Sequence, residues 1–92
     1  MAKFNSRTLA VASGTRLRSL RLALGFDTIR SMAEETGVHE DRYRAWEIGS
    51  NLVPPDYVTE LFERWGVTHD WIYRGDHTGL SPKLYKAIKA VA

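Results

Sequence analysis

Residues 28–49 read TIRSMAEETGVHEDRYRAWEIG, and this stretch carries start and stop signals for two consecutive helices. Thr28 is a residue type that caps helix N-termini, and Gly37 is typical of the position just past a helix end. The apolar positions between them recur at helical spacing, and they are Ile29, Met32 and Ala33. The first half of the stretch therefore predicts a helix of about nine residues.

The second helix of the stretch is predicted by a cap at His39. With the cap at that position, Val38 precedes it and Tyr43 takes the fourth helical position, which is the pairing of a hydrophobic staple. Glu40 and Asp41 then fall in the first turn, where the helix dipole favours negative charge. The glycine that closes the stretch ends the helix. Two short helices joined by a tight turn are therefore expected.

The segment before this pair contains one further predicted helix. Over residues 15–24, the side chains Leu17, Leu20 and Leu24 recur at helical spacing, and a glycine follows them. Residues 1–14 mix polar and small apolar side chains without a sustained period. We therefore expect residues 1–14 to form a flexible N-terminal arm.

Three more helices are predicted after the quoted stretch. Pro54 and Pro55 begin a helix that Gly66 ends, and the apolar side chains between them form one stripe. Thr68 caps a short helix over residues 69–74, and a glycine follows it. Residues 76–92 form a C-terminal extension in which Ser81 caps one last, peripheral helix. No strand-like alternation or internal repeat interrupts this pattern, so the sequence predicts an all-α fold.

The composition fits one small domain. The chain has 92 residues, of which 43% are hydrophobic, and this is enough for a single modest core. Its net charge of +2 is a weak indication of an anionic partner. It has no cysteine, which excludes disulfides and thiolate metal sites. No apolar run approaches the roughly 18 residues of a membrane span, so we expect a cytoplasmic protein with no membrane partner.

Two charged residues occupy positions where charge is expensive. Arg21 lies four residues after Leu17 and three before Leu24, on the buried face of its helix. Glu47 lies four residues after Tyr43. We expect these two side chains to form a buried ion pair, because each compensates the charge of the other. The alternative is that both extend to solvent along the protein surface.

Five motifs occur in order along the chain: RLRSLR at 16–21, MAEETGV at 32–38, WEIG at 46–49, Pro54, and GVTHDWIYRG at 66–75. In this order and spacing, the chain resembles the Cro/repressor (XRE-type) helix-turn-helix family and its phage-repressor relatives over residues 15–75. The resemblance implies a five-helix lambda-repressor-like DNA-binding domain with an extra short C-terminal helix. It also implies that residues 28–48 form the helix-turn-helix unit, and that Arg21 and Glu47 pair.

The resemblance further implies which residues read DNA. In this family the second helix of the unit, here the recognition helix over residues 39–48, enters the major groove. Its base-reading positions fall on Glu40, Asp41, Arg44 and Ala45. An arginine can bond guanine with two hydrogen bonds, a glutamate can accept from cytosine N4, and an alanine can contact a thymine methyl. The implied function is sequence-specific binding of double-stranded DNA by a small transcriptional repressor. A solvated, charged helix face is the alternative.

Phosphate contacts are expected from residues that flank this helix. The candidates are Arg16, Arg18, Thr28, Arg30 and Arg42. The chain departs from the family pattern in the loop over residues 50–53, which carries no basic side chain, and at Ile29, where relatives commonly hold glutamine. The two acidic residues at the start of the recognition helix also oppose the phosphates. Selectivity is then expected to rise while affinity falls.

A homodimer is expected, because one recognition helix reads only a few base pairs and a monomer would bind weakly. The expected interface is residues 77–92, which offer the apolar side chains Leu84, Tyr85, Ile88 and Val91. The alternative left open is that this segment folds back on its own core.

Two other function classes compete with DNA binding. An antitoxin or adaptor that holds a protein partner on the same scaffold is the main alternative, and the acidic start of the recognition helix favours it. No nucleophile, base and orienting group occur in a recognisable arrangement, so we expect no enzyme activity and no catalytic residues. The histidines lack ligand spacing, so we expect neither a metal nor another cofactor; they are His39, His69 and His77.

Overall fold

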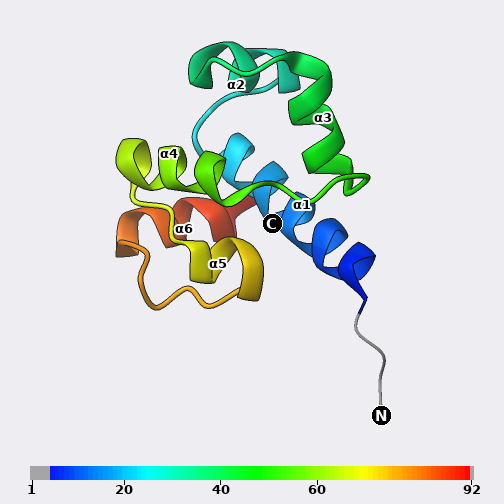
Figure 1. Ribbon diagram of the computed structural model, residues 1–92. Coiled ribbons are helices and arrows are strands. Elements are labelled where there is room, and N and C mark those ends of the chain that lie inside the picture. Colours follow the sequence, from blue (N-terminus) through cyan, green and yellow to red (C-terminus); the bar gives the residue numbers. More distant parts are fainter. Residues whose placement is uncertain (1–4, 92) are drawn as a thin grey trace.

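The computed structural model describes residues 5–91, and within that range it consists of six helices and no strands (Figure 1). The all-α class is therefore confirmed. The helices are α1 (Ser6–Ala23), α2 (Ile29–Thr36), α3 (Glu40–Ile48), α4 (Pro55–Trp65), α5 (His69–Arg74) and α6 (Pro82–Val91). None of the helices in the described range has the length and apolarity that a membrane crossing needs.

The helix boundaries after α1 follow the caps expected from the sequence. Thr28, His39 and Thr68 each accept a hydrogen bond from a backbone N–H in the first turn of the helix they begin, at 3.0 to 3.2 Å. Gly37 ends α2 at φ 78° and Gly49 ends α3 at φ 82°, in the left-handed region that glycine adopts without a steric penalty. Local capping chemistry therefore fixes the ends of the central helix pair.

Helix α1 is longer than the sequence pattern predicts. It begins at Ser6, where the side chain of Asn5 accepts hydrogen bonds from two backbone N–H groups. The expectation of a flexible arm over residues 1–14 is therefore wrong for residues 6–14, and residues 1–4 lie outside the described range. The additional turns are buried through small residues, among them Ala10 and Gly14, rather than through large apolar ones. This is why they give no hydrophobic period.

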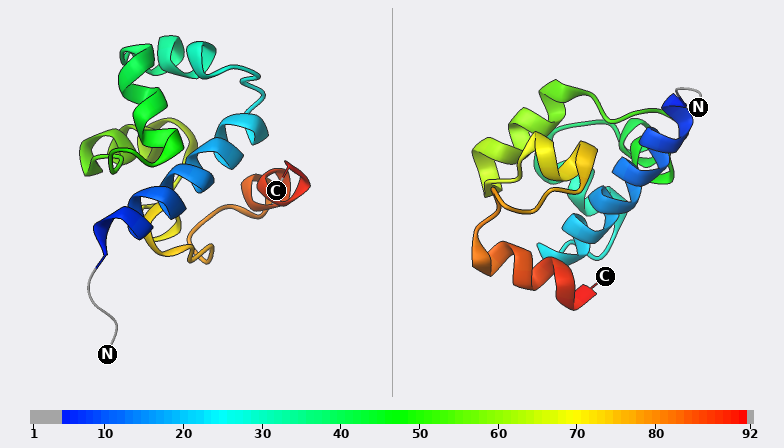
Figure 2. Two further views of the ribbon diagram at one scale, coloured as in Figure 1. Left: turned by 90° about the vertical axis from the view of Figure 1, so that its right-hand side faces the viewer. Right: turned by 90° about the horizontal axis from the view of Figure 1, so that it is seen from below.

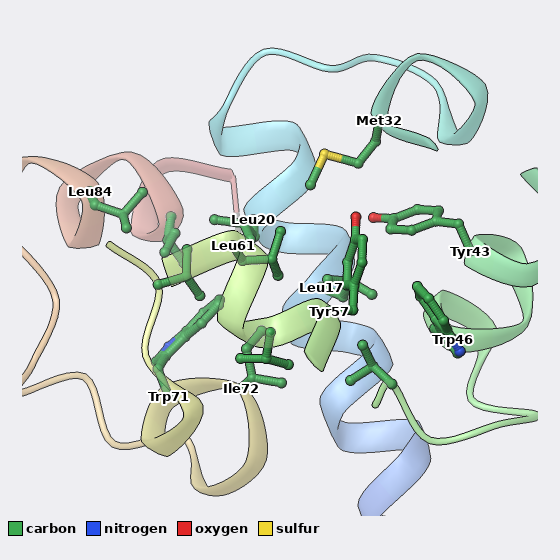
Figure 3. Close-up of a cluster of buried hydrophobic side chains, with 14 of the residues drawn as sticks. Leu17, Leu20, Met32, Tyr43, Trp46, Tyr57, Leu61, Trp71, Ile72 and Leu84 are labelled. Carbon is green, nitrogen blue, oxygen red and sulfur yellow. The ribbon is translucent and has the colours of Figure 1, made fainter. Parts of the chain in front are cut away.

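The core lies around α1, which contacts α3, α5 and α6 (Figure 2). Leu17 and Leu20 of α1 are fully buried at its centre. Figure 3 shows side chains from all six helices converging on this region; the other labelled ones are Met32, Tyr43, Trp46, Tyr57, Leu61, Trp71, Ile72 and Leu84. One continuous core therefore packs against one side of α3, and the opposite side of this helix faces solvent.

Helix α6 folds back on this core. It packs against α1, and its apolar residues Leu84 and Ile88 are buried there. Only Val91 among its large apolar side chains is exposed, and Tyr85 is half-buried against His77, whose ring it stacks on at 4.2 Å. The apolar surface expected to serve as a dimer interface is therefore used inside the chain itself. The homodimer stays a prediction, but α6 does not offer the exposed apolar surface on which that prediction was based.

Candidate nucleic-acid interface

Helices α2 and α3 form a compact pair joined by a tight turn. The turn begins at Gly37, whose N–H donates to the carbonyl of Glu34 at 3.3 Å, and Val38 N–H donates to the carbonyl of Ala33 at 3.0 Å. Ala33 itself is only 1% exposed, as a small residue at the contact between two helices should be. Figure 1 shows the pair projecting from the rest of the fold, with α3 running back towards α1.

A buried ion pair fixes α3 to α1. The Arg21 guanidinium donates to the Glu47 carboxylate at 2.9 and 3.1 Å, and the side chains are only 7% and 4% exposed. Arg21 Nη1 also donates to the carbonyl of Phe26 at 2.9 Å, which ties in the loop before α2. The hydrogen bonds to Glu47 raise the pKa of Arg21, although burial opposes this. The pair expected from the sequence is present and sets the position of α3.

A close backbone approach reinforces this attachment. A Cβ atom added at Gly14 would lie 2.5 Å from the carbonyl oxygens of both Trp46 and Glu47. A Cβ at Gly49 would lie 2.7 Å from the Cα of Val11. The absence of side chains at these two glycines therefore lets α1 pass directly against the C-terminal end of α3. The sequence analysis missed both contacts because they join residues far apart in the chain.

The outer face of α3 presents charged side chains to solvent. Asp41 and Arg44 are exposed, while Glu40 and Ala45 are half-buried. Arg44 Nη2 lies 2.7 Å from Glu40 Oε2, and the two side chains are 47% and 37% exposed. Two of the four residues expected to read bases therefore bond to each other in the free protein. An exposed pair at this spacing contributes only about 0.3 to 0.5 kcal/mol, so a stronger partner can replace it.

The expected phosphate-binding residues do not all lie at this face. Arg30 shares a hollow with Glu40 and Asp41, although its guanidinium is bonded to Glu34 at 3.1 Å. Arg42 lies over the Trp46 ring at 5.4 Å, on the side of α3 that faces the start of α4. Both guanidinium groups therefore have a partner in the free protein.

Thr28 and Arg18 are exposed, as phosphate contacts require. The hydroxyl oxygen of Thr28 already accepts a hydrogen bond from the N–H of Ser31 at 3.0 Å, so its capping role comes first. Arg18 lies on the outer side of α1. Its exposed charge is available to an anionic partner without disturbing the core.

Arg16 has a different role from the one expected. Its Nη1 donates to the carbonyl oxygen of Ile72 at 2.9 Å, and its guanidinium lies against Gly75 at the end of α5. The side chain is therefore bonded to the C-terminal end of α5 and not presented with the α3 face. Sequence reasoning could not foresee this, because the two partners lie 56 residues apart.

One exposed residue of the α3 face was missed by the sequence analysis. Ile48 follows Arg44 by four positions and Asp41 by seven, so the three side chains share one face of the helix. Ile48 is 65% exposed, more than any other large apolar residue in the described range. The helical spacing alone could have identified it. No protein-family model, curated protein or solved structure matches this chain.

Proposed function

We propose that this protein binds specific sequences of double-stranded DNA and represses transcription, with α3 lying in the major groove. The observation that carries the proposal is the contrast between the two sides of α3. One side is held to α1 by the Arg21–Glu47 pair, while the other exposes Asp41 and Arg44. A helix anchored along one side and polar along the other is suited to reading base edges. The lambda-repressor-like helix-turn-helix arrangement is part of this proposal.

Base reading requires the Glu40–Arg44 pair to separate. Arg44 then bonds guanine O6 and N7, and Glu40 accepts from the N4 amino group of a cytosine. Ala45 is the position suited to a thymine methyl. The exchange is favourable because a bidentate contact contributes more than the exposed pair that it replaces. Two opposite charges that are mutually satisfied in free solution also reduce binding to unrelated DNA.

Phosphate contacts come from the surroundings of α3. Arg18, Thr28, Arg30 and Arg42 are exposed and stay candidates. Arg16 is left out, because its bond to Ile72 holds it on α5. With so few cations and two carboxylates at the start of α3, a single copy should bind weakly. We therefore propose two copies on a pseudo-palindromic site, with half-sites about 34 to 36 Å apart.

Selection from a random duplex pool tests the proposal directly. The intact protein is incubated with the pool at a stated salt concentration, bound duplexes are sequenced, and the preferred site is confirmed by gel shift. We expect enrichment of one short motif in two symmetric copies. Failure to enrich any motif, together with no gel shift at low salt, would contradict DNA binding.

A second candidate function is binding of a protein partner, as an antitoxin or adaptor. The acidic start of α3, with Glu40 and Asp41 in its first turn, favours it because these side chains repel a polyanion. Glu34 and Glu35 extend the acidic character along α2 and are both exposed. Substituting Glu40 and Asp41 by Gln and Asn separates the two functions. Binding to random DNA should strengthen in the variant while the preference for cytosine at the Glu40 contact is lost, whereas binding to a basic protein partner should weaken.

A further inference from the structure

The most exposed large apolar side chain in the described range lies at the C-terminal end of the proposed base-reading face. Ile48 is 65% exposed, and it shares that face with Asp41 and Arg44. An isoleucine left in water one turn beyond Arg44 gains little for folding. Its exposure therefore points to a partner that supplies an apolar group at this position.

Ile48 also borders a hollow of about 550 Å³ between the first turns of α1 and the loop after α3. Figure 1 shows these first turns of α1 beside the end of α3. Val11 and Leu52 continue the apolar surface there and are 47% and 40% exposed. Around them lie the polar side chains of Arg7 and Asn51. The hollow thus has an apolar centre and a hydrogen-bonding edge.

The charge of this hollow identifies the partner. Among the described residues that line it, Arg7 is the single charged one and none is a carboxylate. The edge of the major groove offers thymine methyl groups beside a row of phosphates, which matches an apolar centre with a cationic edge. A two-fold contact between copies of this surface would instead bring two Arg7 side chains together without a balancing charge.

We propose that Ile48 reads thymine, with its side chain against the C5-methyl group at one end of the half-site. Arg7 then binds the neighbouring phosphate from the first turn of α1. This inference rests on the proposed DNA binding and adds a specificity residue to it. It also gives a role to the first turns of α1, which lie outside the region that resembles known repressors.

Replacing thymine by deoxyuridine removes the methyl group and nothing else, which makes the test sharp. Each thymine of the selected site is replaced in turn, and binding of the wild type and of Ile48→Ala is measured. We expect one position per half-site at which deoxyuridine weakens DNA binding by the wild type about fourfold. This is the effect of burying roughly one methyl or methylene group. Ile48→Ala should bind both duplexes alike at that position.

Phe62→Ala is the matched control, because Phe62 is also exposed, at 51%, but lies on α4. It should keep the full sensitivity to deoxyuridine. Arg7→Gln should lower the slope of log affinity against log salt by about one phosphate contact and leave base preference unchanged.

The outcomes separate this inference from the function on which it rests. If no preferred site exists, both the proposed sequence-specific DNA binding and the thymine contact of Ile48 are contradicted. If a preferred site exists but Ile48→Ala and the wild type respond equally to every deoxyuridine, the thymine contact alone is wrong. Light scattering of DNA-free protein covers the remaining case. If Ile48→Ala turned a dimer into a monomer, the hollow would be a contact between copies, and the proposal would be overturned.

Discussion

Glu40 and Arg44 lie one turn apart on α3 and hold each other at 2.7 Å, although each is a candidate to read a different base. The pair cancels one positive and one negative charge at the surface where DNA is proposed to bind, and it leaves the exposed Asp41 beside it. It therefore links affinity to selectivity, because only a duplex that offers partners to both side chains compensates for breaking it.

The first prediction concerns Arg44. Arg44→Ala should relax base preference at one position and weaken binding to the preferred site by about 1 to 3 kcal/mol, since a bidentate base contact is lost. Arg18→Ala should weaken binding to all duplexes alike. Titrations of both variants on the preferred site and on random DNA measure the difference. Equal losses on both kinds of DNA for Arg44→Ala would exclude base reading by this residue.

The second prediction concerns the buried ion pair. Glu47→Ala leaves the Arg21 charge buried without its partner and should lower the free energy of unfolding by about 3 kcal/mol. Glu40→Ala breaks only an exposed pair and should change it by less than about 0.5 kcal/mol. Urea unfolding followed by circular dichroism compares the two. Native stability of Glu47→Ala would show that the pair does not hold α3.

The third prediction separates Arg16 from Arg18. Arg16→Ala removes the donor to the Ile72 carbonyl and should destabilise the fold by about 1 to 2 kcal/mol, while the salt dependence of DNA binding stays unchanged. Arg18→Ala should do the reverse and reduce the salt slope by about one. A reduced salt slope in Arg16→Ala would mean that this side chain leaves α5 and joins the phosphate contacts.

The fourth prediction concerns Gly14. Alanine normally favours a helix over glycine by about 1 kcal/mol, but a Cβ here would overlap two backbone carbonyl oxygens of α3. We expect Gly14→Ala to destabilise the protein by at least about 1 to 3 kcal/mol through this overpacking. Thr15→Ala, at the exposed neighbouring position, is the control and should be close to neutral. Thermal melts of both variants decide the point.

The fifth prediction concerns alkaline pH. Burial raises the pKa of Tyr57 to about 12 from an ordinary value of 10.0, and its hydroxyl is 3.0 Å from that of Thr36. The folded state therefore keeps the phenol proton more tightly than the unfolded chain does. Stability from this group is complete below pH 10 and is lost as the pH rises towards 12.

Tyr57→Phe should remove that part of the pH dependence. Its free energy of unfolding is expected to fall less than that of the wild type over this range. Burial raises the pKa of Tyr43 as well, so some alkaline sensitivity should persist in the variant. Denaturant titrations at a series of pH values measure the difference. Identical pH slopes in the two proteins would contradict the prediction.

Contacts within one helical turn could be predicted from the sequence more closely than contacts between residues far apart in the chain. Caps such as Thr28 and His39 act within one helical turn, so the ends of α2 and α3 could be predicted closely. The Arg21–Glu47 pair could also be predicted, because each charge interrupts an apolar face. Contacts of Gly14 and Arg16 could not, since their partners are backbone groups elsewhere in the chain, which leave no trace in the local pattern.

The central position of α1 has a consequence for the order of events during synthesis. Its residues leave the ribosome before those of the other five helices, yet its partner Glu47 follows 26 residues after Arg21, and the Ile72 carbonyl follows 56 residues after Arg16. A nascent α1 has neither partner, and most of the stability of a helix in a protein comes from the packing of one face against the rest of the fold. The contacts of α1 are therefore complete only once α5 and α6 have been synthesised. Folding is then completed late and nearly at once, with the proposed DNA-reading surface assembled in the same event.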